Sequence, residues 1–99
     1  MAEVRYTHKA VEDLTDIWNY TADVWSERQA DDYYEMLVAS CRKIADNPEL
    51  FGREYRKLGD GIYGFKVNRH IVFYRILSDG IEVVRILHER MDLSNRFAD

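Results

Sequence analysis

The stretch HIVFYRILSDGIEVVRILHE, residues 70–89, decides the fold because it contains two apolar runs joined by a tight turn. Both runs are rich in β-branched and aromatic residues, which favour strands. Asp79-Gly80 between them is a strong signal of a two-residue hairpin turn. The stretch therefore predicts two antiparallel strands, residues 70–77 and 81–89.

This turn also predicts a register, because Ser78 then pairs with Ile81 and every side chain of the hairpin is assigned to a face. One face is expected to carry Val72, Tyr74, Ile76, Val83, Arg85 and Leu87, and the other Ile71, Phe73, Arg75, Val84, Ile86 and His88. Both faces are largely apolar, whereas a helix hairpin covers only one face of a small sheet. The second face is therefore expected either to bind a partner or to be covered by the C-terminal segment.

The residues before this hairpin add further strands. Residues 61–67 form a third strand-like run, which a weaker turn signal at Asn68-Arg69 joins to the hairpin. Residues 49–60, ELFGREYRKLGD, are expected to form a basic loop. Near the N-terminus, EVRYT (residues 3–7) alternates and reads as a short strand.

Two helices are predicted between the first strand and the basic loop. Thr7 is a good cap for an amphipathic helix over residues 8–25, whose apolar positions share one face. Ser26 and Gln29 have the spacing of a capping box and restart the helix, and Asn47-Pro48 ends it. Helices joined so tightly form an antiparallel hairpin. The predicted fold class is α+β, in the order β-α-α-β-β-β, with the helix hairpin packed on a small antiparallel sheet and a short C-terminal segment.

Length and composition indicate one globular domain over residues 1–99. The chain is 46% hydrophobic, with five Gly and one Pro, and shows no sign of disorder. No apolar run approaches the length of a membrane span, and the first residues lack the apolar region of a signal peptide. We therefore expect a cytoplasmic protein. The single cysteine, Cys41, lies on an apolar helix face and is interpreted as a core residue, with thiol chemistry as the alternative.

Charge is distributed unevenly along the chain. Residues 1–47 carry ten acids against five bases, a net charge of −5, whereas residues 53–90 carry eight bases against five acids, a net charge of +3. The overall charge of −4 argues against a general nucleic-acid binder, because phosphate neutralisation requires a dominant basic surface. A local basic patch remains available to an acidic partner.

Few residues suggest catalysis. The three histidines show no metal-ligand spacing, and phosphate loops and GxSxG are absent, so neither metal nor cofactor is expected. His88, Arg75 and Lys66 fall on one predicted sheet face and could serve an RNase, which needs acid–base groups and cations. The alternative is that the arginines pair with Glu82, Glu89 and neighbouring acids while His88 ends the last strand.

Aromatic residues on the predicted helices also have two interpretations. Trp18, Trp25, Tyr33 and Tyr34 are more often core residues than ligand platforms. Some of them would nevertheless be exposed at the edge of the helix hairpin, where they could anchor a partner.

The chain resembles the ParE toxins of bacterial type II toxin–antitoxin systems, in the RelE/ParE superfamily. The resemblance rests on the opening strand, on the run A-x-x-D-L-x-x-I-W-x-Y over residues 10–20, on NRHIVFYRI over residues 68–76 and on RILHERMD over residues 85–92. It implies the fold predicted above, a non-enzymatic toxin that poisons DNA gyrase, and a hetero-oligomer with a ParD-like antitoxin. From the net charge and the lack of a membrane-length apolar run, we expect no sequence-specific nucleic-acid binding and no membrane association.

Candidate partner residues follow from this resemblance. In ParE-like proteins the C-terminal segment is linked with gyrase inhibition, and here it maps onto His88, Arg90, Met91 and Asp92. An antitoxin that wraps a helix and an acidic tail around the toxin would bind the surplus apolar and basic surface. This surface is expected to include Trp18, Trp25, Tyr33, Tyr34, Arg53, Arg56, Arg69 and Arg75.

Two alternatives to the gyrase poison remain open. The first is the sister group of RelE-like, ribosome-dependent mRNA interferases, although the last tyrosine here is Tyr74, so the C-terminal Tyr common in that group is missing. The second is a chain that keeps the fold and the antitoxin site without toxicity.

Overall fold

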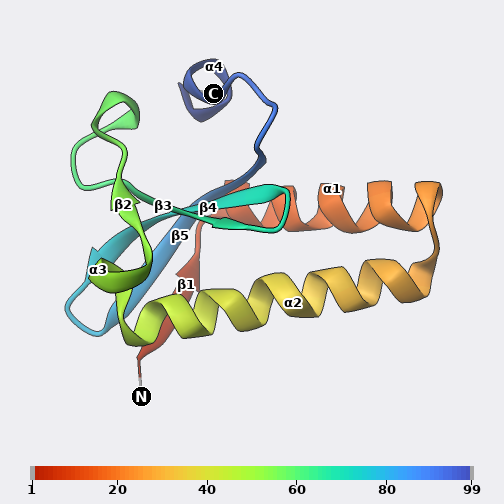
Figure 1. Ribbon diagram of the computed structural model, residues 1–99, viewed down its shortest axis with the longest axis horizontal. Coiled ribbons are helices and arrows are strands. Elements are labelled where there is room, and N and C mark those ends of the chain that lie inside the picture. Colours follow the sequence, from red (N-terminus) through yellow and green to blue (C-terminus); the bar gives the residue numbers. More distant parts are fainter. Residues whose placement is uncertain (1, 99) are drawn as a thin grey trace.

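Two long helices packed on one face of a five-stranded sheet make up most of the computed structural model, which describes residues 2–98 (Figure 1). The strands are β1 (Glu3–Tyr6), β2 (Arg53–Glu54), β3 (Tyr63–Val67), β4 (His70–Leu77) and β5 (Gly80–His88). The helices are α1 (His8–Val24), α2 (Glu27–Asp46), α3 (Pro48–Phe51), the 3₁₀ turn η1 (Arg56–Leu58) and α4 (Leu93–Ala98). The predicted α+β class is confirmed.

The helix boundaries follow from the capping residues that the sequence predicts. The Thr7 hydroxyl accepts a hydrogen bond from the Ala10 N–H at 3.1 Å, and the Ser26 hydroxyl accepts one from the Gln29 N–H at 3.1 Å. These bonds satisfy N–H groups that a helix start leaves without a partner. Helix α2 stops at Asp46, immediately before Asn47-Pro48.

The sheet has the strand order β1-β5-β4-β3-β2 and is mixed, because β1 pairs in parallel with β5 while the other pairs are antiparallel. The sequence predicts an antiparallel sheet, since periodicity does not reveal which strand a terminal segment joins. Gly80 permits this pairing: a Cβ at its position would collide with the backbone of Glu3. The expected basic loop contains one further short edge strand, β2, which pairs with Tyr63 and Gly64.

The predicted register of the β4–β5 hairpin is wrong. The turn residues are Ser78 and Asp79, and Leu77 pairs with Gly80. The register then shifts between Tyr74, which pairs with Val83, and Phe73, which pairs with Arg85. Val84 is the extra residue of a β-bulge, a feature that alternation of apolar residues does not reveal.

The bulge exchanges the faces of the residues that follow it. Ile86 packs with Val72 and Tyr74 in the core beneath the helices, whereas Leu87 packs with Ile71 and Phe73 on the outer face. The expected placement of Leu87 beside Val72, and of Ile86 beside Ile71, is therefore wrong, because one inserted residue inverts the alternation.

Both sheet faces are covered. On the helix-facing side, α1 and α2 bury the larger core, which includes Leu14, Leu37 and Cys41. Burial raises the pKa of the Cys41 thiol to about 11, as expected of a core cysteine. On the outer face, residues of η1 and α4, among them Leu58 and Phe97, pack over the second apolar cluster. The C-terminal segment thus folds back over the outer face.

A largely buried ion pair fixes α1 to the bulge of β5. Asp13 accepts hydrogen bonds from Arg85 Nε at 2.9 Å, from Arg85 Nη2 at 3.1 Å and from the Ile86 N–H at 2.9 Å. The side chains of Asp13 and Arg85 are only 11% and 14% exposed. Because the carboxylate also accepts the Ile86 N–H, two residues after the inserted Val84, the pair stabilises the bulge as well as the helix position.

Candidate functional site

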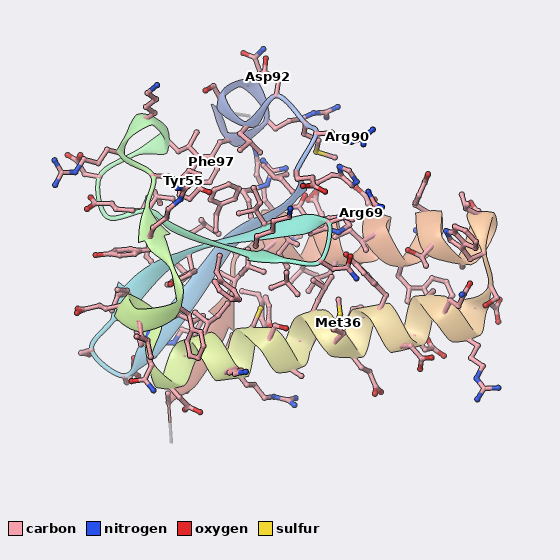
Figure 2. All side chains as sticks on the ribbon, viewed as in Figure 1. Met36, Tyr55, Arg69, Arg90, Asp92 and Phe97 are labelled. Atoms are coloured by element: carbon pink, nitrogen blue, oxygen red, sulfur yellow. The ribbon has the colours of Figure 1, made fainter. Side chains whose placement is uncertain are left out.

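A groove of about 620 Å³ lies where the helix hairpin extends past the end of the sheet. Helix α1 supplies one wall, Trp25 and Tyr33 lie at the helix hairpin, and the β3–β4 turn and the end of β5 complete it. Its lining consists of Asp16, Ile17, Tyr20, Thr21, Trp25, Tyr33, Asn68, Arg69, His70, His88, Arg90 and Met91. Figure 2 shows Arg69 at the tip of the β3–β4 hairpin and Arg90 in the segment between β5 and α4.

The groove continues into a second hollow of about 420 Å³ along the helix hairpin. Thr21, Trp25 and Tyr33 line both hollows, and the second adds Gln29, Asp32 and Met36. Several apolar groups here contact water: Tyr20 is 67% exposed, Trp25 69% and Met91 40%. Exposed aromatic residues around a concave surface are typical of a protein-binding site.

Tyr33, His70 and His88 form a cluster in the wall of the groove. The Tyr33 hydroxyl lies 2.6 Å from His70 Nδ1, and the His70 and His88 rings meet edge to face with their centroids 5.2 Å apart. Burial, with a smaller effect of His88, lowers the pKa of His70 to about 4. Burial also raises the pKa of the Tyr33 hydroxyl. At neutral pH both His70 and Tyr33 are therefore uncharged.

His88 organises the chain that follows it. Its Nδ1 accepts a hydrogen bond from the Arg90 N–H at 3.1 Å, and its carbonyl accepts one from the Met91 N–H at 3.1 Å. Glu89 donates its N–H to the Arg69 carbonyl at 2.9 Å, and its carboxylate lies 2.8 Å from Lys66 Nζ. That hydrogen bond with Lys66 lowers the pKa of Glu89. These contacts place Arg90 and Met91 at the groove.

The groove is lined by residues of the expected gyrase-inhibition segment and by residues of the expected antitoxin-binding surface. Of the gyrase-inhibition segment, His88, Arg90 and Met91 line it, whereas Asp92 lies beyond it and accepts hydrogen bonds from Asn95 of α4. Of the expected antitoxin-binding residues, Trp25, Tyr33 and Arg69 line it.

The other expected antitoxin-binding residues lie outside the groove. Trp18 donates its indole N–H to Asp31 at 2.9 Å across the helix hairpin. Tyr34 is 40% exposed on α2. Of the remaining three, Arg53 of β2 lies over the Tyr55 ring, Arg56 of η1 pairs with Glu54, and Arg75 of β4 donates a hydrogen bond to the Asp60 carbonyl.

The three residues that could serve an RNase, His88, Arg75 and Lys66, do not lie together in the structure. His88 pairs with His70 and lies toward the helices, while Lys66, the cross-strand partner of Ile71, lies on the outer face. Arg75 is on that outer face too, five residues along β4 from His70, or roughly 17 Å. The three residues share a face only in the predicted register, which lacks the bulge at Val84.

Sequence reasoning missed six residues that line the groove, namely Asp16, Ile17, Tyr20, Thr21, Asn68 and His70. Tyr20 and Ile17 belong to the A-x-x-D-L-x-x-I-W-x-Y run, but their exposure depends on where the sheet ends. His70 was missed because the expected register pairs His88 with Ile71. Cross-strand pairing in the correct register would have placed the two histidines opposite each other.

The described part of the chain offers little for other kinds of site. Within residues 2–98, no group of three or more His, Cys, Asp or Glu side chains has a geometry that could hold a metal ion. In the same range, no helix combines the length and the apolar character needed to cross a bilayer.

Known proteins resemble this chain over most of its length. The family model described as ParE toxin of type II toxin–antitoxin system, parDE, matches residues 4–93. Toxin ParE1 of Caulobacter vibrioides is 35% identical over 92 residues, which are 93% of this chain and 94% of that protein. Toxin ParE1 of Mycobacterium tuberculosis is 37% identical over 81 residues, which are 81% and 82% of the two chains.

Two solved structures share the fold. A structure described as the chromosomal ParDE system from P. aeruginosa has a TM-score of 0.78 at 18% identity, covering 89% of this chain and 96% of that chain. The toxin–antitoxin complex RelBE2 from Mycobacterium tuberculosis has a TM-score of 0.63 at 19% identity, covering 89% and 98%. At these identities the structures show a common fold alone.

Proposed function

Since the chain belongs to the ParE toxin family of type II toxin–antitoxin systems, we propose that it inhibits DNA gyrase by binding and that a ParD-like antitoxin neutralises it by occupying the groove. The action is binding rather than catalysis, and it takes place in the cytoplasm. The supporting observation is that Arg90 and Met91, from the gyrase-inhibition segment, form one wall of the groove that also contains Trp25 and Tyr33.

This shared wall gives a physical reason for neutralisation. An antitoxin segment that fills the groove would contact Trp25 and Tyr33 and would cover Arg90 and Met91 at the same time. Gyrase and antitoxin would then compete for one surface, so neutralisation would require no structural change in the toxin.

Charge at the groove supports an acidic antitoxin segment. Arg69 and Arg90 both lie at the rim, and among residues 2–98 neither has a carboxylate within 4.0 Å. Two such cations beside an apolar surface suit a segment that carries both apolar and acidic side chains.

Gyrase inhibition is tested with purified gyrase in supercoiling and DNA-cleavage assays. The unmodified protein should block supercoiling and accumulate cleaved DNA, and the antitoxin should reverse both effects. A chain that stops after Glu89 should lose inhibition, because it lacks Arg90 and Met91. Supercoiling that proceeds normally with the unmodified protein would refute the proposal.

Antitoxin binding is tested with a matched pair of aromatic substitutions. Trp25→Ala should weaken antitoxin binding by roughly tenfold or more, as loss of a central anchor does. Tyr34→Ala removes another exposed ring of the same hairpin that lies outside the groove, so its effect should be under roughly twofold. Equal losses in isothermal titration calorimetry would show that the antitoxin covers more than the groove.

The Tyr33–His70–His88 cluster favours one second candidate function, a ribosome-dependent mRNA interferase. An RNase needs one group to accept the 2′-hydroxyl proton and another to protonate the leaving oxygen, with cations to hold the phosphate. The two histidines and the two rim arginines are groups of these kinds. In that case His88→Ala should suppress cleavage of translated mRNA, and absence of cleavage by the unmodified protein would dismiss this function.

A further inference from the structure

Residues 89–92 join the two faces of the sheet. They leave β5 at His88 on the helix-facing side, pass the groove at Arg90 and Met91, and enter α4, which covers the outer face. Figure 2 shows Arg90 and Asp92 along this path and Phe97 at its far end, near Tyr55. The segment is therefore held at both ends rather than being a free tail.

The first anchor is His88. Its ring packs against His70, which Tyr33 of α2 contacts in turn, and its Nδ1 accepts the Arg90 N–H. This anchor fixes the backbone up to Met91 through the additional hydrogen bond to the His88 carbonyl.

The second anchor is α4. Leu93 and Phe97 are spaced i,i+4, so they project from the same side of this short helix and pack into the outer apolar cluster. The Phe97 and Phe73 rings meet edge to face at 5.5 Å. Six residues are too few for a helix that is stable by itself in water, so the packing determines whether α4 forms.

Polar contacts fix the orientation of α4. Arg85 Nη1 donates a hydrogen bond to the Arg96 carbonyl at 2.6 Å, while the same side chain is held by Asp13 of α1. At the other end, the Asp92 carboxylate accepts from Asn95 Nδ2 at 2.8 Å and from the Asn95 N–H at 3.4 Å, as a helix cap does. Asp92 thus serves the anchor rather than the groove.

We propose that α4 is a positioning element, which holds residues 89–92 in the conformation that binds the target, with Phe97 as its principal positioning residue. The proposal rests on the proposed gyrase inhibition and adds a part of the chain that touches the outer face instead of the groove. A loop anchored at both ends loses less conformational freedom on binding than a loop anchored at one end. Release of α4 should therefore weaken inhibition although Arg90, Met91 and Asp92 are all present.

Two truncations separate positioning from direct contact. A chain that stops after Asp92 keeps the whole segment and lacks only the anchor, whereas a chain that stops after Glu89 lacks both. We expect the longer truncation product to need roughly tenfold more protein for half-inhibition of supercoiling than the full chain. Inhibition equal to that of the full chain would overturn the proposal. Failure of the full chain itself to inhibit would instead refute the proposed function.

Point substitutions test the same anchor in the full-length chain, in case the truncated protein exposes too much apolar surface to fold. Phe97→Asn should reduce inhibition by a similar factor, and Phe97→Leu, which keeps an apolar group in the cluster, should restore most of it. Leu50→Asn changes a leucine that is 75% exposed on α3, away from the anchor, and should have no effect. Equal potency of the Phe97→Asn and Phe97→Leu variants would contradict the proposal.

Amide hydrogen exchange supplies a readout that does not involve gyrase. The Arg90 N–H is hydrogen-bonded to His88, so it should exchange slowly in the full chain and at least roughly tenfold faster in the Phe97→Asn variant. If inhibition falls while the Arg90 amide stays protected, α4 contacts the target directly and does not act by positioning.

Discussion

Apolar side chains of α1 lie in two different surroundings. In the first half, Ala10 and Leu14 are 0% and 4% exposed because the sheet lies beneath them. In the second half, Tyr20 and Val24 are 67% and 51% exposed. Figure 1 shows the cause: the helix hairpin continues past the ends of the strands. A continuous amphipathic helix thus contributes core residues over the sheet and exposed apolar side chains beyond it, where we propose that the antitoxin binds.

We therefore expect the α1 side chains over the sheet to determine stability and those beyond the sheet to determine partner binding. Side chains over the sheet are covered within the chain, so their loss should be measured as unfolding free energy. Tyr20, Val24 and Trp25, which lie beyond the sheet, are mostly exposed, so their loss should be measured as partner affinity. The boundary falls near Ile17, which packs against the core and also lines the groove.

The largest effect is expected at Asp13, in the half over the sheet. Asp13→Ala removes the carboxylate that holds Arg85 and the Ile86 N–H. Loss of one member of a buried ion pair typically costs about 3–5 kcal/mol of unfolding free energy. Urea denaturation followed by circular dichroism should show this loss, whereas Glu12→Gln, in an exposed pair with His8, should change stability by about 0.5 kcal/mol or less. A cost near 1 kcal/mol for Asp13→Ala would mean that the bulge needs no such support.

A second large effect is expected at Leu14. Leu14→Ala leaves a cavity between α1 and the sheet and should reduce the free energy of unfolding by about 3 kcal/mol. The groove lies further along the helix, so antitoxin affinity measured under fully folded conditions should remain unchanged. A parallel loss of affinity would show that the two halves of α1 are coupled.

Tyr20→Ala is the converse change in the half beyond the sheet. Because most of this ring is exposed, its removal should alter stability by no more than about 0.5 kcal/mol. It forms part of the groove wall, so antitoxin binding should weaken by roughly tenfold. Titration calorimetry measures the antitoxin affinity, and urea denaturation of the same sample measures the free energy of unfolding. If Tyr20→Ala lowered the unfolding free energy by more than the binding free energy, Tyr20 would behave like Leu14 and the predicted difference would be wrong.

The sequence predicted the parts of the fold that depend on local chemistry. Thr7, Ser26 and Asn47-Pro48 mark helix boundaries because caps and proline act on their immediate neighbours. The sequence did not predict the pairing of β1 with β5 or the bulge at Val84, because both depend on distant segments. The bulge matters most, since one extra residue decided which face carries Ile86 and which carries Leu87.

Only part of the candidate site was predicted, because the rest depends on how distant segments pair. Resemblance to the family indicated His88, Arg90 and Met91, and the exposed Trp25 agrees with the expectation that part of the hairpin edge is uncovered. His70 could not be predicted as a site residue, because its position opposite His88 depends on the shifted register. Asp92 was assigned to the gyrase-inhibition segment, although its side chain binds within α4, an element that the sequence did not predict.

The smallest expected effect concerns His70, at the border between the core and the groove. Its pKa is lowered to about 4, so between about pH 6.5 and pH 4 the unfolded chain binds a proton that the folded chain does not. The free energy of unfolding should therefore fall as the pH decreases through this window, by about 1 kcal/mol after allowance for the partial contact of the ring with water. The lowered pKa of Glu89 acts in the same direction at the acidic end.

Substitution isolates the contribution of His70 from that of Glu89. His70→Gln should make the decrease in unfolding free energy between pH 6.5 and pH 4.5 shallower, because the variant has no imidazole to protonate in the unfolded state. His8→Gln removes a histidine whose side chain is 90% exposed, so it serves as the control for the loss of one imidazole. Identical pH profiles for the unmodified and His70→Gln proteins, measured by urea denaturation, would show that the ring accepts a proton as readily in the folded wall of the groove as in the unfolded chain.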